Sequence, residues 1–169
     1  MLTVGCHLST SKGFAAMGRT ALSLGANTFA FFTRNPRGGS AKAIDAADAA
    51  ALRELMVEHD FGPLVAHAPY TLNLARLSRG ARICRMCMAD DLVRMEAVPH
   101  SYYNFHPGSH VTQGAEYGIE LIERLLNEVL APEQTTTVLL ETMAGKVLKW
   151  AARSRNLRRS SSASNLPTT

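Results

Sequence analysis

Apolar residues along this chain fall into short runs, and these alternate with longer stretches whose apolar positions recur every three or four residues. The short runs are typical of strands: residues 2–8 (LTVGCHL), 27–33 (NTFAFFT), 63–67 (PLVAH), 102–106 (YYNFH) and 135–141 (TTTVLLE). The longer stretches predict helices over 11–25, 45–60 and 112–131, and mostly helical structure over 70–100. The chain therefore reads as strand and helix in alternation.

Five strands separated by helices predict a parallel sheet with crossover connections. Two α/β architectures fit this order, a doubly wound sheet and a TIM (β/α)₈ barrel. The Gly-rich phosphate loop of dinucleotide-binding folds is absent after the first strand, which disfavours the doubly wound sheet. A complete barrel takes about 250 residues. The 169 residues therefore predict an incomplete barrel of about five β/α units.

The composition fits a soluble globular protein, with 46% apolar and 19% charged residues. No apolar run approaches the ~20 residues that span a bilayer, and the first ten residues lack the pattern of a signal peptide. A cytoplasmic location is therefore expected. Cys84 and Cys87 form a C-x-x-C, but no second ligand pair accompanies them, so we interpret them as thiols on a helix.

The positive charge lies at the C-terminal end. Residues 147–169 hold five Lys/Arg and no acid, so residues 1–146 carry 18 − 5 = 13 basic against 14 acidic residues. The pI of about 9.2 thus reflects the tail. The composition divides the chain into a folded part, 1–146, and a basic Ser/Arg-rich tail, 147–169, which we expect to be disordered.

Side chains that can bind a metal ion lie where the predicted strands end. His67 closes the third predicted strand, His106 the fourth and Glu141 the fifth. Because parallel strands end at one edge of a sheet, we expect these side chains to meet. Two imidazoles and a carboxylate are an ordinary ligand set for catalytic zinc, with a position left for water. The alternative for each residue is a structural side chain held by hydrogen bonds.

Two further histidines lie near the same edge in the sequence pattern. His7 comes late in the first strand, and His110 follows the Pro-Gly turn of "NFHPGSH". Either could orient a metal ligand by hydrogen bonding. His7 could equally cap the following loop, and His110 could equally be solvated.

Six segments, in order, resemble the motifs of the endonuclease IV family: "GCHLS", "GANTFAFFTRNPR", "HAPYTLNLA", "MADDLVRMEAVP", "NFHPGSHV" and "LLETMAGK". The resemblance covers residues 1–146. It implies a TIM barrel and a monomeric, zinc-dependent apurinic/apyrimidinic (AP) endonuclease of DNA repair. Such enzymes hydrolyse the phosphodiester 5′ to an abasic site in duplex DNA, leave a 3′-hydroxyl, and use a trinuclear zinc cluster.

The resemblance also implies roles for single residues. His67, His106 and Glu141 fall on three of the zinc ligands of the catalytic centre, with Glu141 as a bridging carboxylate. Arg37 and Tyr70 fall in the two loops that enter the DNA at the lesion. Without the resemblance, Arg37 would be a solvated loop charge and Tyr70 a packing residue at the barrel rim.

The chain departs from the family after Lys146. The family's remaining ligands follow this point, whereas residues 147–169 contain no His, Asp or Glu. We interpret the tail as a frameshift or truncation, and expect at most one complete zinc site and an inactive fragment. Two other functions stay open: a metal-dependent sugar isomerase or epimerase, and a non-catalytic DNA-binding fragment that uses Arg37, Tyr70 and the tail.

Overall fold

The computed structural model describes residues 2–37, 39–75 and 80–141. The strands are β1 (Gly5–Leu8), β2 (Thr28–Phe32), β3 (Val65–His67), β4 (Tyr102–Phe105) and β5 (Thr137–Leu140). The helices are the 3₁₀ turn η1 (Thr10–Lys12), α1 (Phe14–Ser23), α2 (Ala46–Glu58), α3 (Ala81–Met95) and α4 (Ala115–Val129). No helix in these residues is both long and apolar enough to cross a bilayer. The predicted tail, 147–169, lies outside the described residues.

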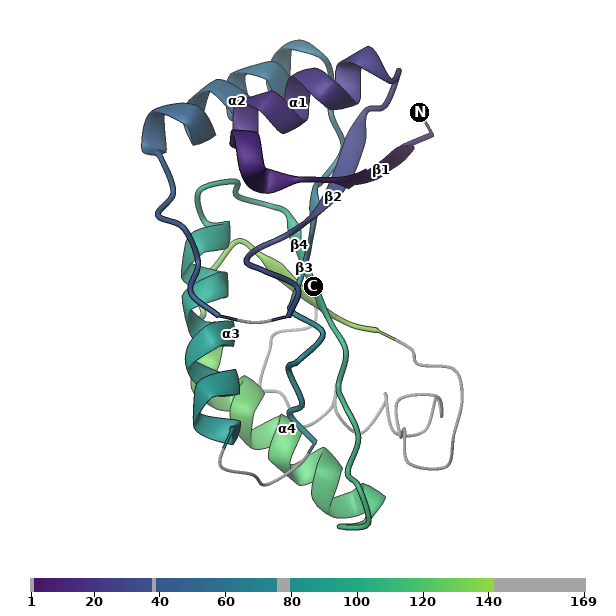
Figure 1. Cartoon of the computed structure of the whole chain (residues 1–169), viewed down its shortest axis with the longest axis vertical. Coiled ribbons are helices and arrows are strands. Elements are labelled where there is room, and N and C mark those ends of the chain that lie inside the picture. Colours follow the sequence, from purple (N-terminus) through teal and green to yellow (C-terminus); the bar gives the residue numbers. More distant parts are fainter. Residues whose placement is uncertain (1, 38, 76–79, 142–169) are drawn as a thin grey trace.

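The five strands form one parallel sheet in the order β1-β2-β3-β4-β5. Each crossover therefore moves the chain one position in the same direction, as in a barrel. Figure 1 shows α1 and α2 packed together at the end of the molecule that carries β1 and β2. A doubly wound sheet would reverse direction at a switch point. The prediction of an incomplete α/β barrel is confirmed, and the strand order excludes the doubly wound alternative.

The two faces of the sheet have different surroundings. Side chains that alternate along the strands and point toward the helices are buried, among them Phe29, Phe31, Tyr103 and Phe105, each no more than 1% exposed. Residues of the other face, including His67 and Asn104, are only partly buried. This second face corresponds to the interior of a barrel, and its strand ends carry the candidate site.

Two predicted helices differ from the observed ones. The first begins with η1 and becomes α-helical only at Phe14, because the carboxylate of Asp48 accepts the N–H groups of Phe14 and Ala15 and fixes the helix start there. In the long segment after β3, the helix covers only Ala81–Met95. Residues 70–75 form turns and irregular backbone, and the Asn73 side chain bonds to the neighbouring loop through both the N–H and C=O of Ser109.

Candidate functional site

Three side chains meet at the carboxyl ends of β3, β4 and β5. One ligand atom from each of His67, His106 and Glu141 lies within 4.8 Å of the other two. His67 Nε2 is 3.2 Å from Glu141 Oε2, and His106 Nδ1 is 3.7 Å from Glu141 Oε1. The two imidazole rings lie 5.1 Å apart, centroid to centroid. The structure thus brings together the three residues that the strand ends predicted.

The sheet ladder holds these residues at one level. His67 pairs with Asn104 in register, and the N–H of Ala68 donates to Asn104 O at 2.9 Å. On the other side of β4, the N–H of Glu141 donates to Phe105 O at 3.0 Å. The ladder therefore continues past the strand ends, which fixes the backbone beneath each of the three side chains.

Neighbouring groups orient two members of the cluster. His67 Nδ1 lies 2.6 Å from the carbonyl oxygen of Ala68, to which it donates, and this contact turns Nε2 toward Glu141. The Asn104 amide donates to Glu141 Oε2. Nothing in the strand-end pattern pointed to Asn104 itself. Its position two residues before His106, on the same face of the strand, is the signal that could have found it.

The donor set fits a zinc ion. Zinc bonds of about 2 Å place ligand atoms roughly 3–4 Å apart, so a spread of 4.8 Å needs only small side-chain adjustments. The three side chains are 15%, 22% and 35% exposed, which leaves the cluster accessible from the inner face. Two neutral imidazoles and one carboxylate would leave a coordination position for water or a phosphate oxygen.

The other two candidate histidines take different positions. His7 packs on Phe32 at 4.5 Å between ring centroids, and burial together with the nearby His67 lowers its pKa. It therefore lies beside the cluster. His110 is buried outside the three-residue group, and its Nδ1 has no hydrogen-bond partner among the described residues.

The turn that carries His110 depends on Gly108. Gly108 has φ +86, and a Cβ at this position would lie 2.2 Å from Asn73 Oδ1. The Asn73 side chain is the clamp between the loop after β3 and the loop after β4. The Pro-Gly turn thus brings two loops of the rim into close contact.

Tyr70 stands over the cluster of His67, His106 and Glu141. Its side chain is 61% exposed, and its ring lies 5.3 Å from the ring of His67 and 5.8 Å from that of His106. An aromatic ring that touches both imidazoles and remains accessible is placed to meet whatever binds at the cluster.

Arg37 occupies the loop after β2. Its N–H donates to the Asn35 side chain at 2.9 Å, and the N–H of Tyr70 donates to Pro36 O at 2.9 Å. The second bond ties the loop of Arg37 to the loop of Tyr70. The two loops that the family resemblance singled out are therefore one connected surface at the rim.

A buried ion pair anchors the start of the Arg37 loop. The Arg34 guanidinium donates to Asp91 on α3 at 2.9 and 2.7 Å and to Gly39 O at 3.2 Å. Burial and the adjacent Asp91 raise the pKa of Tyr103, so its hydroxyl stays protonated and donates to Asp91 at 2.9 Å. Nothing in the sequence pattern singled out this network.

Cys87 lies next to the same guanidinium, with Sγ 3.7 Å from Arg34 Nη1. Burial nevertheless raises the pKa of the Cys87 thiol. Both Cys84 and Cys87 are unpaired, half-buried thiols on α3, as interpreted from the sequence.

Comparison with known proteins identifies the family. Residues 19–159 match the model of the xylose isomerase-like TIM barrel family. The chain belongs to this family. Within the xylose isomerase-like TIM barrels, it is 58% identical over 147 residues to a probable endonuclease 4 from Alkaliphilus oremlandii, covering 86% of this chain and 52% of that protein. It is 59% identical over 144 residues to a probable endonuclease 4 from Akkermansia muciniphila, covering 85% and 52%.

A solved structure agrees with this placement in the xylose isomerase-like TIM barrels. Endonuclease IV from Thermus thermophilus superposes with a TM-score of 0.80 at 27% identity, over 97% of this chain and 60% of that one. The resemblance to endonuclease IV is thereby confirmed. The chain spans about half the length of the curated relatives that it matches.

Proposed function

We propose that His67, His106 and Glu141 bind one zinc ion and belong to the active centre of an endonuclease that hydrolyses the phosphodiester 5′ to an abasic site in duplex DNA, leaving a 3′-hydroxyl. The observation that carries the proposal is the convergence of these three side chains at one rim of the sheet. It is supported by the relatives of the chain, which are named probable endonuclease 4. We propose a cytoplasmic monomer as the working form.

Zinc held by these residues supplies Lewis acidity, since it lowers the pKa of water to ~7 and offsets negative charge on phosphate oxygens. The chain's own residues set the geometry for this chemistry. Glu141, oriented by Asn104, contributes the anionic ligand, and His67, fixed by Ala68 O, presents Nε2. Tyr70 shields one side of the two imidazoles from water.

Arg37 and Tyr70 are the proposed DNA contacts. Arg37 lies exposed in its loop, where a guanidinium can pair with a backbone phosphate. The exposed ring of Tyr70 can stack on a base or wedge into the gap left by the missing base. The hydrogen bond from Tyr70 N to Pro36 O supports joint action of the two loops.

We further propose that a polypeptide of these 169 residues, tested by itself, binds about one zinc and incises DNA poorly. The sequence holds no His after His110 and no Asp or Glu after Glu141 to complete further metal sites. Displacement at phosphorus is helped by metals on both the attacking and the leaving oxygen. Loss of a single charge-stabilising group costs on the order of 10²–10³ in rate.

A chimera tests the proposal. Residues 1–146 are joined to the remaining C-terminal half of the Alkaliphilus oremlandii relative, and incision of a duplex with one abasic analogue is measured with added zinc. The chimera is expected to incise, and His106→Ala and Glu141→Gln are expected to lower its rate by at least about 10²-fold. His59→Ala, at a side chain 40% exposed on the end of α2, is the matched control and should leave the rate unchanged.

Two results would contradict the proposal. A chimera that folds but does not incise would remove the endonuclease assignment, and aldose–ketose interconversion by it would favour the isomerase alternative. Rapid incision by the 169-residue polypeptide itself, abolished by His106→Ala, would show that the further metal sites are unnecessary.

A further inference from the structure

A second cavity lies outside the metal-ligand cluster. It has a volume of about 350 Å³ and opens between the start of α1, the loop from β2 to α2, and the end of α3. None of the three metal ligands lines it. Its size is at the lower end of the range for small-molecule sites. The cavity is therefore a separate candidate for ligand binding.

The floor of the cavity is apolar. Phe31, Met17 and Met95 are each no more than 2% exposed, and Phe14 stands beside them. Phe14 and Phe31 also pack edge to face at 5.6 Å between ring centroids. Such a floor accepts a flat or apolar body.

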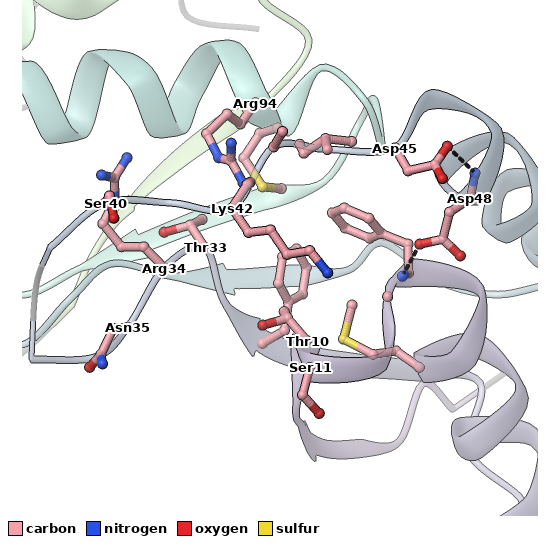
Figure 2. A pocket seen from close by; sticks show the side chains of 17 residues that line it. Thr10, Ser11, Thr33, Arg34, Asn35, Ser40, Lys42, Asp45, Asp48 and Arg94 are labelled. Carbon is pink, nitrogen blue, oxygen red and sulfur yellow. Dashed lines mark hydrogen bonds between the residues drawn. The ribbon is translucent and has the colours of Figure 1, made fainter.

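The rim carries positive charge that no carboxylate of the described residues neutralises. Figure 2 shows the Lys42 side chain extending across the middle of the cavity, with Arg94 on one side and Thr10 and Ser11 on the other. No hydrogen bond or ion pair engages the Lys42 ammonium within the described part of the chain. Arg94 donates from Nη2 to the backbone carbonyl of Lys42 at 2.7 Å. Arg94 Nε and Thr33 Oγ1 are buried and have no hydrogen-bond partner among the described residues. Buried donors of this kind are costly to leave unpaired.

The two acids of the cavity are already engaged. Asp45 accepts from the backbone N–H groups of Ala47 and Asp48 at the start of α2. Asp48 accepts from Phe14 and Ala15 at the start of α1. Both carboxylates thus neutralise helix N-termini, and they lie at the opposite end of the cavity from Arg94 (Figure 2). Arg34, which also lines the cavity, is paired with Asp90 and Asp91.

We propose that this cavity binds a small organic anion with a planar or apolar body, of the size and chemistry of a nucleoside monophosphate. The anionic group pairs with Lys42 and Arg94 and accepts from the Thr33 hydroxyl. The body lies on Phe14 and Phe31. Because the loop from β2 to α2 forms one wall, the ligand bridges that loop to α1 and α3. The proposal does not depend on the nuclease function.

Calorimetric titration of the metal-free 169-residue protein, with chelator present, tests the proposal using adenosine 5′-monophosphate as the probe. Binding is expected at one site per chain and more tightly than inorganic phosphate or adenosine, because only the monophosphate uses both the rim and the floor. Lys42→Gln and Arg94→Gln are each expected to weaken binding by at least about tenfold, as for loss of a charge-assisted hydrogen bond.

Lys12→Gln is the matched control, since Lys12 lies in η1 and does not line the cavity. This variant changes the charge by the same amount and should bind the monophosphate like the parent. Circular dichroism confirms that all variants fold. Absence of saturable binding, equal affinity for inorganic phosphate, or equal weakening by Lys12→Gln would each overturn the proposal.

Discussion

Asp91 is expected to be one of the most sensitive positions for the stability of this fold. Its side chain is 0% exposed, accepts two hydrogen bonds from Arg34, and accepts a third from the Tyr103 hydroxyl. Asp91→Asn keeps the size of the side chain and removes its charge. The Arg34 guanidinium, only 5% exposed, then keeps Asp90 as its remaining carboxylate.

The expected loss of unfolding free energy in Asp91→Asn follows from the hydrogen bonds that the substitution weakens. Two bonds to a charged acceptor weaken to neutral strength, a loss of about 1 kcal/mol each, and removal of one partner of a buried ion pair costs about 3–5 kcal/mol. Since Asp90 still compensates part of the charge of Arg34, we expect a loss of about 2–4 kcal/mol. This loss is a large share of the ~5–15 kcal/mol that stabilises a typical domain.

Asp90→Asn provides the matched control. Asp90 is bound by the same Arg34 nitrogen, but its side chain is 55% exposed, so this pair is worth at most ~1 kcal/mol. Urea unfolding followed by circular dichroism measures both variants against the parent. If Asp91→Asn destabilised the protein no more than Asp90→Asn does, the reasoning about burial would be refuted.

Three other predictions concern the rim and the sheet. Gly108→Ala should destabilise the protein by at least ~1 kcal/mol in urea unfolding, since φ is +86 and the new Cβ meets Asn73. Unchanged stability would contradict the close contact between the Pro-Gly turn and Asn73. Burial acts to raise the pKa of Glu96, but hydrogen bonds from Thr135 and Thr136 outweigh it and lower the pKa below 4.5. The ionised Glu96 therefore stabilises the fold above pH 4.5, and this stabilisation is lost as the pH falls below that value. Glu96→Gln should therefore flatten the loss of stability between pH 5 and 3, and an unchanged slope would refute this. Elemental analysis should give about one zinc per chain, lost in His106→Ala, and a value near three would contradict the single site.

Much of the architecture could be predicted from the sequence because the signals are local. The strands appear as short apolar runs, and α4 as a helical period in which Ile119 and Ile122 are buried. Boundaries were less predictable. The start of α1 at Phe14 is set by a carboxylate 34 positions away, Asp48, which no local window contains.

The candidate site was predictable in part because its three residues are marked by a local signal, the end of a strand. The three metal-ligand candidates stand at strand ends, and parallel strands of one sheet end at one edge. The sequence did not reveal Asn104, Asn73 or Arg34, because each acts through a partner at least 36 positions away in the chain, on another strand, helix or loop. These side chains orient Glu141 and tie the loops of the rim together.

The sequence by itself determined the order of elements, the three metal-ligand candidates and the resemblance to endonuclease IV, because periodicity and motif spacing are properties of neighbours along the chain. The tertiary structure established the strand order itself, for which the sequence only favoured a barrel over a doubly wound sheet. It alone placed Tyr70 over the imidazoles and left Lys42 and Arg94 facing a cavity. Strand order and cavity depend on which distant segments pack together, and that packing is set by the burial of the whole core at once.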